Sequence, residues 1–235
     1  MDNPLASLFS KYSRLLVLDT ETSGLSYRGD EIIEFSAVLV ENSPLGAFLS
    51  QRYDELIRLS DGKHLNPAIT KLTGITEQAL CEKGIEKTAL CQDLAALLEA
   101  PDTLIIAYNA HFDLSFLYYL LSRDGDPTIL RRDKLDLLTV YKDRRPYPHK
   151  LKDAITAYGL DGRVQNSHRA IDDVVATVEV MKAMAGECDD FLQYINLFGY
   201  NPKYGVEGKR IGSVTYLPQR YYAQNKLYEQ ALPSG

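Results

Sequence analysis

Two acidic residues, Asp19 and Glu21, follow a short apolar run that begins at residue 14. Side chains at positions i and i+2 of a strand point to the same face, so the two carboxylates are expected side by side where a buried strand ends. Neighbouring carboxylates repel one another and resist ionising together. A hard cation with oxygen ligands relieves that repulsion. Taken alone, however, the pair is better explained by a turn in which Asp19 caps the Ser-Gly loop that follows.

Two further acidic groups stand at predicted strand-to-helix or loop-to-helix junctions. Asn109 and Asp113 lie where a strand should give way to a helix, and His168 and Asp173 lie at the start of a later helix. Asn109 is a good N-cap, residues 166–167 offer another cap, and acidic groups are favoured in a first helical turn. Capping therefore explains each junction by itself. Asp173 fits capping less well, because its apolar neighbours should face the sheet.

Together the three sites indicate phosphodiester hydrolysis. Four carboxylates and one histidine at the ends of core elements match a hydrolase in which two divalent ions, ~4 Å apart, hold the scissile phosphate. One ion would orient and acidify the attacking water, and the other would stabilise the leaving 3′-oxygen. Because histidine and cysteine do not form a ligand set, Mg²⁺ or Mn²⁺ is favoured over zinc. A histidine that titrates near neutrality can take the proton from the water.

Three segments carry a resemblance to a known family: VLDTETSGL at 17–25, AYNAHFD at 107–113 and HRAIDD at 168–173. In this order and at these separations they resemble the exonuclease motifs of the DnaQ-like superfamily, as in the exonuclease domain of the DNA polymerase III epsilon subunit. The histidine five residues before the last aspartate resembles the DEDDh branch. The other branch has a tyrosine four residues before it, where this chain has Arg169. The resemblance spans roughly residues 12–186.

The resemblance implies a role for each matching residue. Asp19, Glu21 and Asp173 would hold one ion, and Asp19 would bridge to the second. Asp113 would act mainly through a metal-bound water, and His168 would be the general base. The segment HLNPAITKLTGIT resembles a stretch that these enzymes place beside the terminal nucleotide, against which the leucine of the first motif would wedge. The residues expected to contact the nucleotide or its strand are Thr22, Gly24, Leu25, Leu72, Thr73, Gly74, Ile75, Asn109 and Phe112.

The elements that must position these residues follow from the apolar pattern. Residues 14–19 and 31–40 predict strands, and strand character returns at 55–59, which indicates an early antiparallel meander. A further strand is predicted over 103–109. Residues 135–140 could form a strand or the start of a helix, and their sequence favours neither. Helices are predicted from Pro67 to Gly74, from Thr76 onward, and over 86–99, 112–123, 151–158 and 170–185. This order predicts an α/β fold with a mixed central sheet flanked by helices. The resemblance implies the ribonuclease H-like fold.

The length of 235 residues suits one sizeable α/β domain with an extension. We expect an exonuclease domain over 1–190, and a C-terminal helix and irregular extension over 191–235. The three scattered cysteines indicate reduced thiols, and no apolar run approaches the ~20 residues that span a bilayer. Without a convincing signal peptide, the chain is expected in the cytoplasm, away from membranes.

The net charge of −6 means that any contact with nucleic acid must be local. Basic residues concentrate between 131 and 152, including Arg144 and Arg145. A solvated loop is the plainer interpretation of such a run. Given a nuclease site, the same stretch becomes a plausible second contact for a single strand.

Three functions stay open at this point. The first is a 3′→5′ exonuclease acting on single-stranded DNA in proofreading or repair, the second is the same chemistry trimming RNA, and the third is a non-catalytic adaptor for nucleic acid or a polymerase. A pure binding module has no need for clustered like charges, which disfavours the adaptor. No residue distinguishes DNA from RNA, which requires recognition of the 2′-OH. Residues 224–228, QNKLY, vaguely resemble a sliding-clamp-binding peptide, although chance is the more frequent cause of so short a match.

Overall fold

The computed structural model describes residues 3–44, 46–203, 211–222 and 224–230. Its centre is a five-stranded sheet with the order β3-β2-β1-β4-β5. The strands are β1 (Arg14–Thr22), β2 (Ile32–Ser43), β3 (Gly46–Leu56), β4 (Thr103–Ala107) and β5 (Lys134–Asp136). The pairs β1–β2 and β2–β3 are antiparallel, whereas β1–β4 and β4–β5 are parallel. The predicted mixed sheet and its early meander are confirmed.

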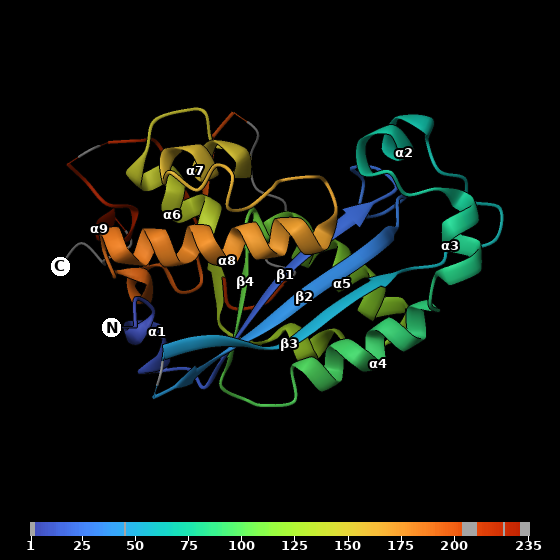
Figure 1. Ribbon diagram of the computed structural model, residues 1–235, viewed down its shortest axis with the longest axis horizontal. Coiled ribbons are helices and arrows are strands. Elements are labelled where there is room, and N and C mark those ends of the chain that lie inside the picture. Colours follow the sequence, from blue (N-terminus) through green and yellow to red (C-terminus); the bar gives the residue numbers. More distant parts are fainter. Residues whose placement is uncertain (1–2, 45, 204–210, 223, 231–235) are drawn as a thin grey trace.

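Helices cover both faces of this sheet (Figure 1). The α-helices are α1 (Ala6–Phe9), α2 (Pro67–Thr73), α3 (Glu77–Lys83), α4 (Lys87–Leu97), α5 (Ala110–Asp124), α6 (Leu137–Arg144), α7 (Leu151–Ala157), α8 (Ala170–Glu187) and α9 (Leu227–Gln230). Two 3-10 turns, η1 (Pro127–Leu130) and η2 (Phe191–Tyr194), and a parallel pair of strands, β6 (Leu197–Tyr200) and β7 (Thr215–Pro218), complete the described elements. The three layers match the predicted α/β architecture.

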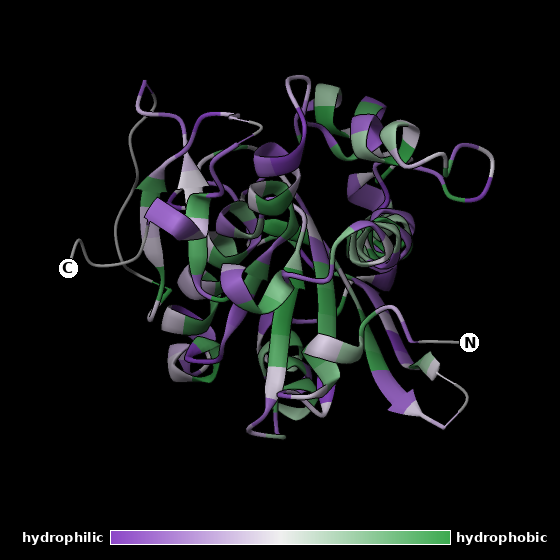
Figure 2. Ribbon diagram, turned by 90° about the vertical axis from the view of Figure 1, so that its left-hand side faces the viewer, coloured by the Kyte–Doolittle hydropathy of each residue, from purple (hydrophilic) through white to green (hydrophobic). Residues whose placement is uncertain are grey.

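The alternation of β1 builds two cores. Leu15 and Val17 point into the core that α8 covers. Leu16 and Leu18 point into the core that α4 and α5 cover. Because all four side chains are at most 1% exposed, β1 is apolar on both faces. Figure 2 shows largely apolar strands at the centre of the molecule, with hydrophilic residues mostly on the outer elements.

Two strands differ from the prediction. The third strand was expected over 55–59 but runs from Gly46 to Leu56. It is an edge strand whose side chains are mostly exposed, so it lacks the apolar run that marks a buried strand. β1 continues to Thr22, so both acidic residues of the first motif lie within the strand. The undecided stretch 135–140 contains the end of β5 and the start of α6.

The described residues after 190 pack against the rest of the chain. Phe191, Tyr194 and Leu197 belong to the core under α8. Phe198 and Ile211 belong to the other core. The boundary at 190 stays a prediction, but this part of the extension is not detached from the sheet. No helix among the described residues has both the length and the apolar character to cross a bilayer.

The packing of α9 contradicts the clamp-peptide interpretation. Leu227 is fully buried in the core under α8, and its backbone N–H donates to a carboxylate oxygen of Asp143 at 2.7 Å. The ring of Tyr228 packs edge-on against Tyr194, with 5.0 Å between the ring centroids. The apolar residues of the peptide are therefore occupied within this chain.

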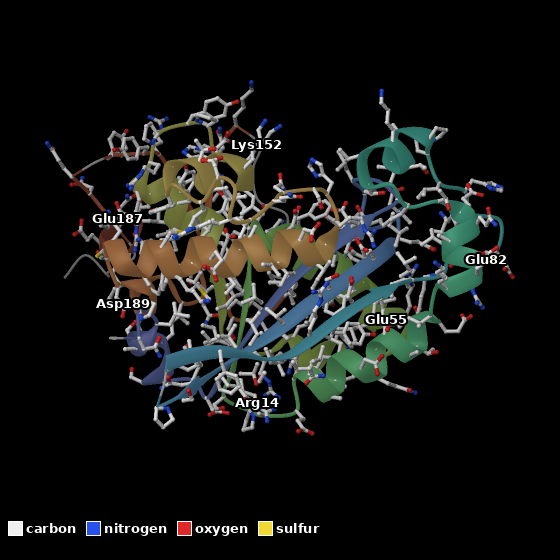
Figure 3. All side chains as sticks on the ribbon, in the orientation of Figure 1. Arg14, Glu55, Glu82, Lys152, Glu187 and Asp189 are labelled. Atoms are coloured by element: carbon white, nitrogen blue, oxygen red, sulfur yellow. The ribbon has the colours of Figure 1, made fainter. Side chains whose placement is uncertain are left out.

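Arg144 and Arg145, expected to contact a strand, both bind groups of this chain. The Arg144 side chain is 3% exposed and donates to the carbonyl oxygen of Met184 and to the carboxylate of Asp190. The Arg145 guanidinium pairs with Glu187 at 2.5 Å. Figure 3 shows Glu187 near the end of α8, away from Lys152 on α7. The expected strand contact by Arg144 was therefore wrong, because its buried guanidinium is occupied within this chain, whereas the contact by Arg145, which is partly exposed, stays a prediction.

Replacing Arg144 should cost stability rather than substrate binding. Arg144→Ala leaves Asp190 and two carbonyl groups without their donor, and breaking a buried ion pair costs about 3–5 kcal/mol. Arg145→Ala removes a half-exposed pair and should cost less than about 1 kcal/mol. Urea unfolding of both variants measures the difference. Equal losses from the two variants would contradict the buried role of Arg144.

Candidate active site

The site lies where β1 ends beneath the first turns of α8. Asp19 and Glu21 continue the face of β1 on which Leu15 and Val17 pack under α8. Their carboxylates therefore share one side of the sheet, as the i and i+2 spacing predicts. Across the ladder Glu21 pairs in register with Glu34 of β2, so a third carboxylate joins the same face.

Asp113 comes to this edge from α5. It lies in the first helical turn, as predicted, and is 2% exposed. Its Oδ1 accepts hydrogen bonds from the backbone N–H of Thr20 at 2.9 Å and from the Thr20 hydroxyl at 2.7 Å. This contact fixes α5 to the residue that stands between the two acidic residues of β1.

Asp173 comes from α8, and one of its oxygens is left free. The residue is 6% exposed, and its Oδ2 accepts a hydrogen bond from the Asn166 side-chain amide at 2.6 Å. Its Oδ1 is buried without a hydrogen-bond partner among the residues that the structure describes. A buried carboxylate oxygen without a partner is costly unless a ligand fills that place.

Glu21, His168 and Asp173 form a group that fits a metal ion. One possible ligand atom from each residue lies within 4.8 Å of the others. His168 is exposed and has a positive φ of 59°, a conformation that few residues other than glycine adopt. The carboxylates suit Mg²⁺ or Mn²⁺. The unpartnered Oδ1 of Asp173 offers a ligand atom to such an ion.

The carboxylates raise one another's pKa values. Burial is the main cause at every position. It raises the pKa of Asp19 well above its ordinary value, helped by the charges of Asp113, Asp173 and Glu21. Burial and the charge of Asp173 raise the pKa of Glu21 to about 8. Burial raises the pKa of Asp113 to about 7 although the hydrogen bonds from Thr20 lower it. Full ionisation at neutral pH therefore needs a compensating positive charge.

An ion pair between a buried carboxylate and an exposed guanidinium, which the sequence analysis missed, holds the start of α8. Glu34 is fully buried and accepts a hydrogen bond from the Arg169 guanidinium at 2.8 Å and another from the backbone N–H of Ala170 at 2.8 Å. Because Arg169 follows His168 directly, this pair fixes the backbone on which the histidine stands. An acidic residue inside the otherwise apolar run of β2 was the signal for this role.

A second anchor, Asp136, holds the start of α5 and was also missed. Its Oδ1 accepts hydrogen bonds from the backbone N–H groups of Asn109 and Ala110, both at 3.0 Å. Its Oδ2 accepts from the backbone N–H of Thr139 at 3.1 Å and from the Thr139 hydroxyl at 2.6 Å. One buried carboxylate thus joins the ends of β4 and β5 to the starts of two helices.

The helix caps expected at the starts of α5 and α8 were wrong in part. Asn109 occupies the N-cap position of α5 but makes no side-chain cap, and its φ is 71°. Its side chain is exposed. At α8 the N-cap position is Arg169, without a side-chain cap. Ser167 instead donates to the Asp172 carboxylate at 2.6 Å. Asn166 and Ser167 thus bind carboxylates of α8 rather than its backbone N–H groups.

Some of the residues expected to contact a terminal nucleotide are exposed, and others are buried. Leu25 is 85% exposed and Leu72 is 50% exposed, so both side chains are accessible to a nucleotide. Thr73 and Ile75 are buried, and the Thr73 hydroxyl accepts from the backbone N–H of Ile75 at 3.1 Å. These two side chains shape the turn at Gly74 rather than reach into solvent.

The remaining predicted contacts lie in the first two motifs. The Thr22 hydroxyl donates to the carbonyl oxygen of Gly24 at 2.6 Å. A Cβ at Gly24 would come within 2.4 Å of the Asp30 carboxylate, so a larger residue there would require that side chain to shift. The ring of Phe112 is half-buried and packs 5.0 Å from Phe116, measured between the ring centroids.

Comparison with known proteins identifies the family. A model of the family described as "Exonuclease" (RNase_T) matches residues 16–181. The DNA polymerase III epsilon subunit of Salmonella typhimurium is 30% identical over 183 residues, which cover 74% of this chain and 72% of the relative. The chain belongs to the exonuclease family. The resemblance found in its sequence is thereby confirmed.

Other relatives are much longer than this chain. The PolC-type DNA polymerase III of Ureaplasma parvum is 28% identical over 191 residues, which cover 80% of this chain and only 13% of that protein. Among solved structures, Escherichia coli Exonuclease I in complex with a dA16 oligonucleotide superposes with a TM-score of 0.65 and 22% identity. The match covers 77% of this chain and 42% of that structure. It confirms the exonuclease fold.

Divalent ions should stabilise the protein more as the pH rises. The pKa of Glu21 rises from 4.5 to about 8 on folding, and that of Asp113 from 3.8 to about 7. The folded, metal-free state thus holds these protons more tightly than the unfolded state does. The contribution of these two groups to its free energy of unfolding should be greatest below their ordinary pKa values and fall as the pH rises toward 8.

Thermal unfolding in EDTA and in Mg²⁺ across this pH range measures the effect. Mg²⁺ should raise Tm most at the alkaline end, where the carboxylates are ionised and repel one another. Glu21→Gln combined with Asp113→Asn should flatten the pH dependence in EDTA. A double variant whose Tm in EDTA has the same pH dependence as that of the unaltered protein would contradict these raised pKa values.

Proposed function

We propose that this chain is a 3′→5′ exonuclease that removes nucleotides from single-stranded DNA with two divalent ions and His168 as the general base. The observation that carries the proposal is the group Glu21, His168 and Asp173, with a buried carboxylate oxygen that lacks a partner among the described residues. The relatives support DNA as the substrate, because two of them are named as forms or subunits of DNA polymerase III and Exonuclease I was solved in complex with a dA16 oligonucleotide.

Each acidic residue has a separate task in this proposal. When bound, the two ions would neutralise the developing charge on the phosphate and lower the pKa of the attacking water. Asp19, Glu21 and Asp173 would hold the first ion, and Asp19 would also hold the second. Asp113 would orient a water bound at the second position. Mg²⁺ and Mn²⁺ both suit these oxygen ligands.

His168 would accept the proton as the water oxygen attacks phosphorus. The bond from phosphorus to the 3′-oxygen of the preceding nucleotide would then break. A nucleoside 5′-monophosphate leaves, and the shortened strand ends in a 3′-hydroxyl that takes up a proton. The exposed position of His168 beside two carboxylates supports this role, because a general base must reach the water from the solvent side of the ions.

The terminal nucleotide would lie between the two exposed leucines and the start of α5. Leu25 would wedge against its base, with Leu72 on the neighbouring turn and Asn109 along the path of the strand. Backbone groups of the other predicted residues would complete this contact, because several of their side chains are buried. The residues assigned to it are Thr22, Gly24, Leu25, Leu72, Thr73, Ile75, Asn109 and Phe112.

A polymerase is the proposed protein partner, on the strength of the epsilon subunit and PolC-type relatives. The clamp-binding peptide is not part of this proposal, since its apolar residues are packed in the core. We also propose a cytoplasmic location, in keeping with three cysteines that all carry free thiols.

Removal of Asp19 should abolish hydrolysis. On 3′-labelled single-stranded DNA, Mg²⁺ or Mn²⁺ should support release of mononucleotides, and EDTA should stop it. Asp19→Ala should lower kcat by roughly 10³-fold or more, because it removes the ligand shared by both ions. Asp61→Ala, which removes an exposed charge before α2, is the matched control. Activity that survives EDTA or Asp19→Ala would overturn the mechanism.

The same assay on RNA tests whether DNA or RNA is the preferred substrate. We expect a clear preference for DNA in kcat/KM. Equal or faster trimming of a matched RNA strand would move the assignment to an exoribonuclease of the same family. Binding of either strand without metal-dependent hydrolysis would instead indicate an adaptor.

Glu34→Gln should slow the reaction without weakening substrate binding. The variant weakens the charged pair that fixes Arg169, so His168 would sample positions away from the water. We expect kcat to fall by about tenfold at unchanged KM, since misplacing a positioned base by about an ångström costs up to 100-fold. Glu55→Gln on the edge strand removes the same charge away from α8 and serves as the control. A loss confined to Tm, with kcat unchanged, would show that Glu34 is structural only.

A further inference from the structure

A hollow beside α7 is not used by the proposed catalytic site. Its volume is ≈ 540 Å³. The residues that line it come from α6, from the loop between α6 and α7, and from α7, and Asn201 also lines it. Its cationic and aromatic side chains are Lys142, Tyr147, His149, Lys150 and Lys152.

Three lysines give the hollow a positive charge. None of the ammonium groups of Lys142, Lys150 and Lys152 pairs with a carboxylate within the described part of the chain. One lining residue, Asp153, is acidic, and its carboxylate accepts a hydrogen bond from the backbone N–H of Lys150 at 2.7 Å. The hollow is therefore locally positive in a chain whose net charge is −6.

These lysines differ from three other cations of the basic stretch. Arg144 and Arg145 are tied to carboxylates. Lys134 is fully buried and donates to a carbonyl oxygen of its own loop at 2.8 Å. These three cations thus bind groups of this chain, whereas the lysines of the hollow do not pair with its carboxylates. A solvated charged loop would explain the lysines alone but not the aromatic ring that accompanies them.

Tyr147 places an exposed aromatic ring among these charges. Its side chain is 85% exposed. The ring stands edge-on to His149, with 5.8 Å between centroids and an interplanar angle of 83°. His149 is itself held, because one ring nitrogen lies 2.8 Å from the carbonyl oxygen of Arg145 and its ring packs edge-on against Tyr141. His149 therefore supports one side of the Tyr147 ring, and most of the ring stays exposed.

A hydrogen bond ties the hollow to the second motif. The Tyr108 hydroxyl donates to the carbonyl oxygen of His149 at 2.9 Å. Tyr108 directly precedes Asn109, and the two stand between β4 and α5, which carries Asp113. In Figure 1, α7 and α2 stand on opposite sides of the end of β1. The hollow thus flanks the catalytic edge on the side away from the exposed Leu72.

We propose that this hollow binds single-stranded DNA upstream of the nucleotide being removed. Lys142, Lys150 and Lys152 would contact successive phosphates, and Tyr147 would stack on one base. Proteins that hold single strands without sequence preference combine a cationic groove with aromatic rings in this way. The inference rests on the proposed nuclease function. It adds a second contact that would keep the shortened strand bound between cleavage events.

Strand binding and catalysis can be measured separately. Fluorescence anisotropy of a DNA strand of about twelve nucleotides, with phosphorothioate linkages at its 3′ end to slow cleavage, reports binding at several salt concentrations. Hydrolysis of a nitrophenyl ester of thymidine 5′-monophosphate reports the catalytic site without an upstream strand. The variants are Lys150→Ala/Lys152→Ala and Tyr147→Ala. The control is Lys83→Ala/Lys182→Ala, which removes the same charge from α3 and α8.

The two variants should weaken DNA binding with different salt dependences. The double lysine variant should raise Kd about tenfold and lower the slope of log Kd against log salt by about 1.4, or roughly 0.7 for each lost phosphate contact. Tyr147→Ala should raise Kd about fivefold or more at an unchanged slope, because stacking carries no charge. The control pair should match the unaltered protein in both quantities.

A Kd and a salt slope equal to those of the control, for both variants, would overturn the inference. Failure of the unaltered protein to hydrolyse the ester would count instead against the proposed nuclease function. In that case, a lysine-dependent salt slope would still show that the hollow binds a strand. A circular dichroism melt of each variant confirms that it is folded before binding is measured.

Discussion

The repulsion among carboxylates at the end of β1 is the constraint on which the rest of this structure depends. Asp19 and Glu21 lie on one face of a strand that is apolar on both sides, and Asp113 and Asp173 reach the same place from two helices. Nothing in the apolar cores favours this gathering of charge, and burial raises the pKa of each carboxylate. The arrangement therefore costs stability in the absence of a cation, and it is stable in the charged form only when a cation is bound. A fold that accepts such a cost does so for a function.

Two polar anchors fix the backbone around these carboxylates, although their own charges add to the repulsion. Glu34 binds the start of α8, and Asp136 binds the start of α5. Both carboxylates are buried and well supplied with hydrogen-bond donors, unlike the free oxygen of Asp173. The site thus contains two kinds of buried acid. One kind is satisfied by protein groups and positions helices, and the other is left unsatisfied, which suits it to bind an ion.

The sequence predicted the motifs and most elements, because both depend on local pattern. β1, the helix from Asn66 to Gly74 and the long α8 follow from apolar periodicity and capping residues. The errors came from contacts between distant residues. β3 is an edge strand whose polar sequence gives no local signal, and Arg144 is buried only because Asp190 lies beside it in space. The roles of Glu34 and Asp136 also depend on partners that are far away in the sequence or at the ends of other elements.

The central claim is that the acidic edge of β1 holds two divalent ions around one phosphate. A crystal structure with Mn²⁺ and a nucleoside 5′-monophosphate tests it most directly, since anomalous scattering locates the metal. We expect two peaks about 4 Å apart, both in contact with Asp19, with Glu21 and Asp173 on one of them and the phosphate between them. Bound nucleotide with no metal at Asp19, or with ions held only by residues outside this group, would contradict it.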